Sequence, residues 1–180
     1  MNTPKKPSPD FLNKPFEHNK EELKAQFKAK ILEQIPIAEI KLQYNKEVAP
    51  KNRLKILDSK QASEVLKALW NPNTIELQEQ FKILYLNNHN QVIGLYPHSE
   101  GSITSTQVDI RLILVGALQC GAVAMTLAHN HPSSNPNPSQ ADKTLTKKIQ
   151  QASSLLDITL LDHIIVTKDD CYSFADAGNL

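Results

Sequence analysis

The stretch LAHNHPSSNPNPSQAD, residues 127–142, places two histidines one residue apart, then a proline-rich loop, then Ser139 three positions before Asp142. An apolar run, AVAMTLA, leads into it and predicts a short buried strand. Side chains of an extended segment repeat every two residues, so His129 and His131 should project to the same side where the strand ends. Two imidazoles placed in this way can share one metal ion.

The proline-rich loop cannot stay helical, and Ser139 is expected to start a helix whose first turn contains Asp142. The apolar face predicted for this helix consists of Leu145, Ile149, Ala152 and Leu156. The loop is long enough to fold Asp142 back onto the histidines. Taken alone, the spacing of Ser139 and Asp142 is more often that of a helix capping pair. The two roles are compatible, because a cap can hold the aspartate still.

Other elements surround this stretch. Residues 58–70 predict a helix that Ser59 caps, and residues 79–96 predict a β-hairpin whose strands meet near residues 87–90. VDIRLILVGALQCG is apolar nearly all round and predicts a buried helix between Asp109 as cap and Gly121 as stop. In the helix predicted for residues 58–70, the side chains expected to face inward are Val65, Leu66 and Leu69.

The N-terminal part of the chain differs in composition from the rest. Residues 1–18 carry four prolines among polar residues and predict a mobile tail. Residues 19–57 form an extension, in which residues 20–34 predict a helix and IAEIKLQYN an exposed strand. Residues 58–180 then predict the domain that carries the histidines.

Composition excludes several classes of protein. A net charge of +1 and a pI near 7.8 give no basic field, so nucleic acid is not supported as a partner. The two cysteines, Cys120 and Cys171, form no CxxC pair and predict neither a disulfide framework nor a cysteine zinc site. No apolar leader and no stretch of about 18 apolar residues occurs, so we expect a cytoplasmic protein without a membrane segment. The oligomeric state stays open.

HNHPSSNPNPSQAD resembles the metal-binding motif of the JAMM (JAB/MPN) metalloproteases, H-x-H followed by S-x-x-D. HNHPS and the later LLDHIIVTKDDCYSFADAGNL are similar to the RadC-like branch of that family, and the resemblance runs from about residue 58 to the C-terminus. It implies an α/β fold with a mixed central sheet flanked by helices, the JAMM/MPN (deaminase-like) fold. It also implies His129, His131 and Asp142 as Zn²⁺ ligands, with Ser139 beside the bound water.

One departure from the family concerns DNA. Many RadC-like chains carry a helix-hairpin-helix region with glycine-bearing hairpins ahead of the metal domain. The first 57 residues here contain no glycine. The resemblance therefore gives no support to DNA as a partner.

Three nitrogen and oxygen ligands leave a fourth tetrahedral position for water, which is the pattern of a catalytic zinc site. Hydrolysis also needs a donor to the developing oxyanion, for which the Ser139 hydroxyl is the nearest candidate, and a general base. From residue 80 to the histidines the acids are Glu100 and Asp109, and Asp109 is expected to cap a helix. Glu100 is therefore the predicted base, although it also fits a surface residue before a turn glycine.

These features predict a zinc metallopeptidase that hydrolyses a peptide or isopeptide bond in a peptide or protein substrate. The alternative is a non-catalytic metal-binding or interaction module of a DNA- or mobile-element-associated protein. A zinc nucleobase deaminase would need H-x-E and P-C-x-x-C, and neither occurs. His163, in LLDHIIV, either orients the site together with Asp162 or has no role at the start of a strand.

Overall fold

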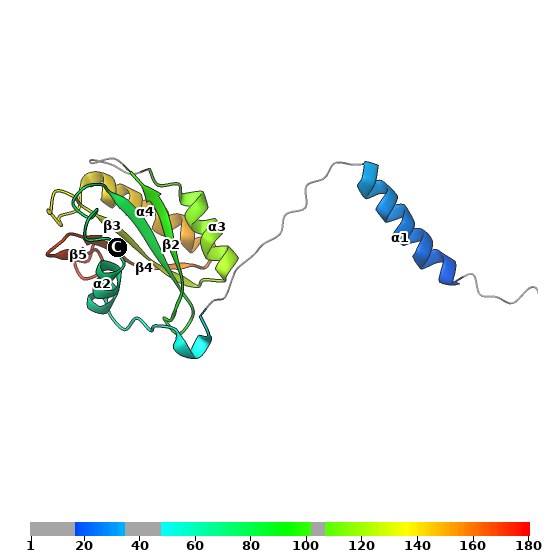
Figure 1. Ribbon diagram of the computed structural model, residues 1–180, viewed down its shortest axis with the longest axis horizontal. Coiled ribbons are helices and arrows are strands. Elements are labelled where there is room, and N and C mark those ends of the chain that lie inside the picture. The colour runs from blue at the N-terminus through cyan, green and yellow to red at the C-terminus, as the bar shows by residue number, and fades with distance from the viewer. Residues whose placement is uncertain (1–16, 35–47, 102–106) are drawn as a thin grey trace, which may run out of the picture. The chain divides into compact units, whose positions relative to one another are not determined.

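The computed structural model describes residues 17–34, 48–101 and 107–180 (Figure 1). The chain divides into two units, Met1–Lys41 and Leu42–Leu180, each of which is described by itself. None of the helices within the described ranges is long and apolar enough to cross a membrane.

The first unit contains helix α1 (Glu17–Gln34), which confirms the helix predicted for residues 20–34 and begins three residues earlier. The last two residues of the predicted mobile tail, 17 and 18, therefore belong to α1. The rest of that tail and the strand predicted from IAEIKLQYN fall outside the described residues.

The second unit is an α/β domain built on one five-stranded sheet of order β2-β1-β3-β4-β5. Its elements are η2 (Pro50–Asn52), α2 (Ser59–Ala68), β1 (Gln80–Leu86), β2 (Val92–Glu100), α3 (Ile110–Cys120), β3 (Ala124–Asn130), α4 (Gln140–Ser154), β4 (Thr159–Val166) and β5 (Cys171–Ser173). Strands β3 and β4 are parallel and the other neighbours are antiparallel, so the sheet is mixed as expected. Strands β1 and β2 form the predicted hairpin.

Helices cover both faces of this sheet (Figure 1). Successive side chains of β1 point to opposite faces, so Leu84 and Leu86 pack with Leu66 of α2 in one core. Ile83 and Tyr85 pack in the other core. That second core includes residues of α3 and α4, and the candidate site lies at its edge. The members of these helices in it are Ile113, Ala117 and Ile149.

The start of the domain and the cap of α2 differ from the prediction. Ile56 already belongs to the buried core, and its backbone N donates to Asn90 O, so the domain begins before residue 58. Asp58, not Ser59, caps α2, because its side chain accepts a hydrogen bond from Gln61 N. Leu69, expected to face inward, is 42% exposed because α2 has ended at Ala68.

Helix α3 has the predicted ends, with Asp109 as N-cap and Gly121 in the left-handed conformation at φ 68°. The expectation that it is buried all round is wrong. Ile113 and Ala117 are fully buried, whereas the opposite face carries exposed apolar side chains. These are Leu112, Val115 and Leu118. Apolar composition therefore did not mean burial, because only one face of the helix contacts the rest of the domain.

Helix α4 begins as predicted, with Ser139 as N-cap. Ile149 is fully buried, but Leu156 lies beyond the last helical residue and is 40% exposed. Thr146 and Ser153 are buried in its place on the face toward the sheet. Both cysteines, Cys120 and Cys171, are free.

Candidate metal centre

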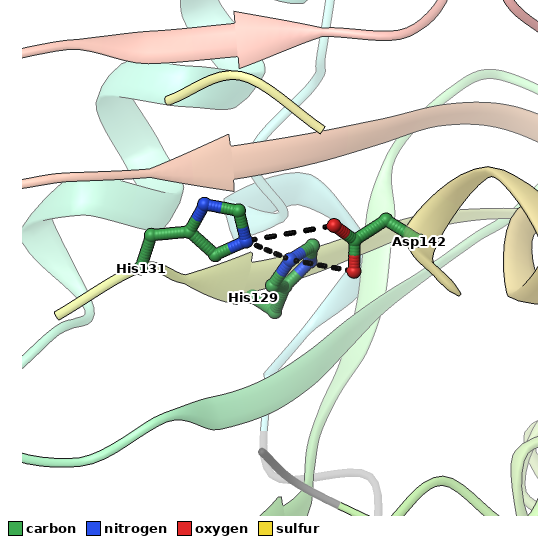
Figure 2. A group of neighbouring side chains, drawn as sticks. All are labelled: His129, His131 and Asp142. Atoms are coloured by element: carbon green, nitrogen blue, oxygen red, sulfur yellow. Dashed lines mark hydrogen bonds and ion pairs between the residues drawn. The ribbon is translucent and has the colours of Figure 1, made fainter. Parts of the chain in front are cut away.

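The two histidines lie at the end of the central strand β3. His129 is the last residue but one of the strand, is 1% exposed, and pairs with Phe81 of β1 across the antiparallel ladder. His131 follows the strand, and its Nε2 lies 2.9 Å from Nε2 of His129. The predicted projection of both imidazoles to one side is confirmed, as Figure 2 shows.

Asp142 is brought to these rings by the start of α4. The Ser139 N and Oγ donate to Asp142 Oδ2 at 2.7 and 2.6 Å, and Asp142 N donates to Ser139 Oγ at 3.2 Å, which is a complete capping box. From this position Oδ1 lies 3.3 Å from His129 Nε2, and Oδ2 lies 3.6 Å from His131 Nε2 (Figure 2). The same aspartate therefore caps the helix and faces the histidines.

The electrostatics of the cluster favour the ionised form of Asp142. Burial would raise the pKa of Asp142, but the contacts with the His129 and His131 rings and the hydrogen bond from Ser139 hold this pKa well below its usual range. The contact with Asp142 raises the pKa of His131, against the opposing effect of partial burial. Asp142 is consequently ionised at neutral pH.

The donor atoms fit a metal ion. His131 Nδ1 lies 2.7 Å from the carbonyl oxygen of Asn135, and a carbonyl only accepts, so Nδ1 carries the hydrogen and Nε2 presents its lone pair. Each of His129, His131 and Asp142 offers one ligand atom, and these atoms all lie within 4.8 Å of one another. Two imidazoles and one carboxylate are a ligand set that zinc accepts.

Glu79 is an acid near the cluster that the sequence prediction missed. Phe81 pairs with His129 at the end of the β1–β3 ladder, and continuing this antiparallel register by two residues beyond it would set Glu79 opposite His131 on the same face. Burial raises the pKa of Glu79, Asp142 adds to this effect, and His129 and His131 lower it, so the carboxyl lies within electrostatic range of all three. The alternation of Glu79 with Phe81 in EQFKILYL is the signal that could have drawn attention to it.

The structure does not bring Glu100 to the cluster. Glu100 pairs with Gln80 across the hairpin and accepts a hydrogen bond from Gln80 Nε2 at 3.4 Å. Gln80 and Lys82 share one face of β1, and Lys82 Nζ lies 4.1 Å above the Trp70 ring, on the side of α2. Glu100 thus lies on the face opposite to His129. The physical reason is the period of two in β1, which separates neighbouring positions between the faces.

His163 of β4 contacts the cluster directly, which favours an orienting role over none. Its Nε2 lies 2.8 Å from His129 Nδ1, and its Nδ1 lies 2.6 Å from Thr146 Oγ1 of α4. The side chain is fully buried, and burial lowers its pKa well below the usual value, so the imidazole is neutral. Asp162, its expected partner, accepts a hydrogen bond from the His163 backbone N at 2.7 Å, whereas the His163 ring nitrogens contact His129 and Thr146. Asp162 also accepts hydrogen bonds from Ser173 Oγ and Ala175 N and so orders the C-terminal turn.

Comparison with known proteins agrees with the resemblance to RadC-like proteins seen in the sequence. The model of the RadC-like JAB domain matches residues 56–179. A UPF0758 protein of Flavobacterium johnsoniae is 46% identical over 125 residues, 69% of this chain and 53% of its own length. The UPF0758 proteins YfjY and YkfG of Escherichia coli (strain K12) are 48% and 47% identical over 103 residues, 57% of this chain and 64% and 65% of their own. The chain thus spans between half and two thirds of these relatives, whose names state no activity.

Proposed function

This chain belongs to the RadC-like JAB domain family, and from that premise we propose that it is a zinc-dependent hydrolase of peptide or isopeptide bonds. The observation that carries the proposal is the convergence of His129 Nε2, His131 Nε2 and the Asp142 carboxylate. The side chains of His131 and Asp142 keep 17% and 14% exposure, so two of the three candidate ligands are partly accessible to solvent. Zinc in such a set lowers the pKa of a coordinated water to about 7 and polarises a substrate carbonyl.

Glu79 is the general base in this proposal, in place of Glu100. In this role its carboxylate would accept a proton from the attacking water and return it to the leaving amine. Partial burial supports this role, because a carboxyl with a raised pKa holds a proton more readily at neutral pH than an ordinary glutamate. Glu100 lies on the far face of the sheet and serves as the matched control.

The Ser139 hydroxyl already donates a hydrogen bond to Asp142 Oδ2, so it is not free to donate to an oxyanion in this arrangement. We assign it first to holding the aspartate. For Ser139 to stabilise an oxyanion as well, the hydroxyl would have to rotate from Asp142 to the substrate, and the Ser139 backbone N would then hold the carboxylate alone.

The experiment that tests the proposal combines metal content with turnover. Full-length protein purified without chelators and re-exposed to Zn²⁺ should hold one ion, and His131→Ala and Asp142→Ala should bind it far more weakly while staying folded. The zinc-loaded protein should cleave members of a broad peptide and isopeptide library. If the wild-type protein binds no zinc, the proposed metal site is wrong. A wild-type protein that binds zinc and cleaves nothing supports the alternative, a non-catalytic metal-binding or interaction module.

A further inference from the structure

A chain of buried hydrogen bonds runs from α4 into the candidate metal centre. Thr146 Oγ1 lies 2.6 Å from the backbone oxygen of Asp142 and 2.6 Å from His163 Nδ1. His163 Nε2 lies in turn 2.8 Å from His129 Nδ1. The three residues linked by these hydrogen bonds, Thr146, His163 and His129, are each at most 2% exposed.

The chemistry of the atoms fixes the direction of each hydrogen bond. A backbone carbonyl carries no hydrogen, so the single hydroxyl hydrogen of Thr146 must lie between Oγ1 and Asp142 O. Thr146 Oγ1 can then only accept from His163, whose Nδ1 therefore carries the hydrogen. The His163 ring is fully buried and its nitrogens contact His129 and Thr146 and no carboxylate, so it is neutral and carries one N–H. His163 Nε2 therefore accepts from His129 Nδ1–H.

With its hydrogen on Nδ1, His129 has no hydrogen on Nε2. Nε2 is the atom that faces His131 and Asp142. His131 reaches the same state by a different contact, the bond from its Nδ1 to Asn135 O. We propose that Thr146 and His163 are positioning residues, which hold the hydrogen of His129 on Nδ1 and so keep Nε2 ready to bind a metal ion. This inference rests on the metal site in the proposed function, but not on any hydrolytic activity.

Removing the Thr146 hydroxyl should reverse the direction of the hydrogen bond between His163 and His129. His163 Nδ1–H would lose its acceptor in a buried place, which is unfavourable. The imidazole avoids this by moving its hydrogen to Nε2, where it can donate to His129 Nδ1. His129 must then carry its own hydrogen on Nε2, which blocks the ligand atom. Thr146 touches the backbone of Asp142 but no ligand side chain, so a loss of zinc affinity would arise through His163.

The test compares Thr146→Val, which keeps the shape and loses the hydroxyl, with Thr146→Ser, which keeps the hydroxyl. Competition with a chelator should show zinc affinity about 10–100-fold weaker in Thr146→Val, the usual effect of losing a partner that orients a ligand, and within about 3-fold of wild type in Thr146→Ser. Imidazole ¹⁵N and ¹³C shifts of the zinc-free proteins at pH 8 give a second readout. They should report hydrogen on His129 Nδ1 in wild type and Thr146→Ser, and on Nε2 in Thr146→Val.

The second readout separates this inference from the proposed function, because it needs neither zinc nor turnover. Thr146→Val with unchanged zinc affinity and with hydrogen still on His129 Nδ1 would overturn the inference. If that variant does not fold, His163→Gln and His163→Leu decide the matter. Gln offers an oxygen to His129 Nδ1 and should retain the tautomer, whereas Leu offers none. A His163→Leu protein with the wild-type tautomer and zinc affinity would equally overturn it.

Discussion

Replacing Glu79 with Gln should abolish most hydrolysis without removing zinc. The side chain keeps its size, and Glu79 is not among the three residues whose ligand atoms converge, so the metal content should match wild type. Loss of a general base typically lowers the rate by about 10²–10⁴-fold. At 1.36 kcal/mol per tenfold, this corresponds to about 2.7–5.4 kcal/mol of transition-state stabilisation.

The matched control is Glu100→Gln, which makes the same chemical change on the opposite face of the sheet. The Gln80 amide, which donates to Glu100, can donate equally to a glutamine oxygen, so both stability and kcat should stay near wild type. The assay is kcat and kcat/KM on one cleaved peptide, with zinc content measured on the same preparations. A Glu79→Gln protein with wild-type kcat, or a Glu100→Gln protein with the larger loss, would refute the assignment made from the β1–β3 register.

Three further outcomes can be measured. Ser139→Ala should lower the free energy of unfolding by about 1 kcal/mol and weaken zinc binding, because the capping box and one bond to Asp142 Oδ2 disappear; chemical denaturation and chelator competition check both effects. Gly116→Ala should destabilise the protein by up to about 2 kcal/mol despite better helix propensity, because the new Cβ would lie 2.5 Å from Tyr85 Oη; adding Tyr85→Phe should restore part of the loss. In chelator, the depressed pKa of Asp142 means that its carboxylate stabilises the fold fully above an unfolded-state pKa of about 3.9, and that this stabilisation is lost progressively as pH falls from there toward the much lower folded-state pKa. The stability difference between wild type and Asp142→Ala should therefore shrink as pH falls below about 4.

Local pattern was enough for some elements of this domain and not for others. The apolar run before His129, the cap at Asp109 and the stop at Gly121 each act within a few residues, and the structure agrees with all three. At the start of α2 two adjacent residues can both serve as N-cap, and the sequence does not distinguish Asp58 from Ser59.

The parts of the site that were missed depend on pairing between distant segments. Glu79 reaches the cluster only because Phe81 lies opposite His129, and nothing local in either strand sets that register. The contact of Thr146 with His163 likewise joins a helix to a strand 17 positions later. The histidine and aspartate motif could be found from its spacing, and His163 could be named as a candidate, whereas Thr146 and Glu79 could not be found.

The three candidate ligands differ in how easily each side chain could move away from a bound metal ion. His129 belongs to the central part of the sheet and its side chain is 2% exposed, and Asp142 is fixed by the capping box. His131 lies past the end of β3, and Asn135 in the adjoining loop holds its ring. Exchange of the metal should therefore begin with His131 swinging outward together with that loop. The rate of metal exchange would follow local opening of this loop and not global unfolding, so the ion would exchange while the domain stays folded.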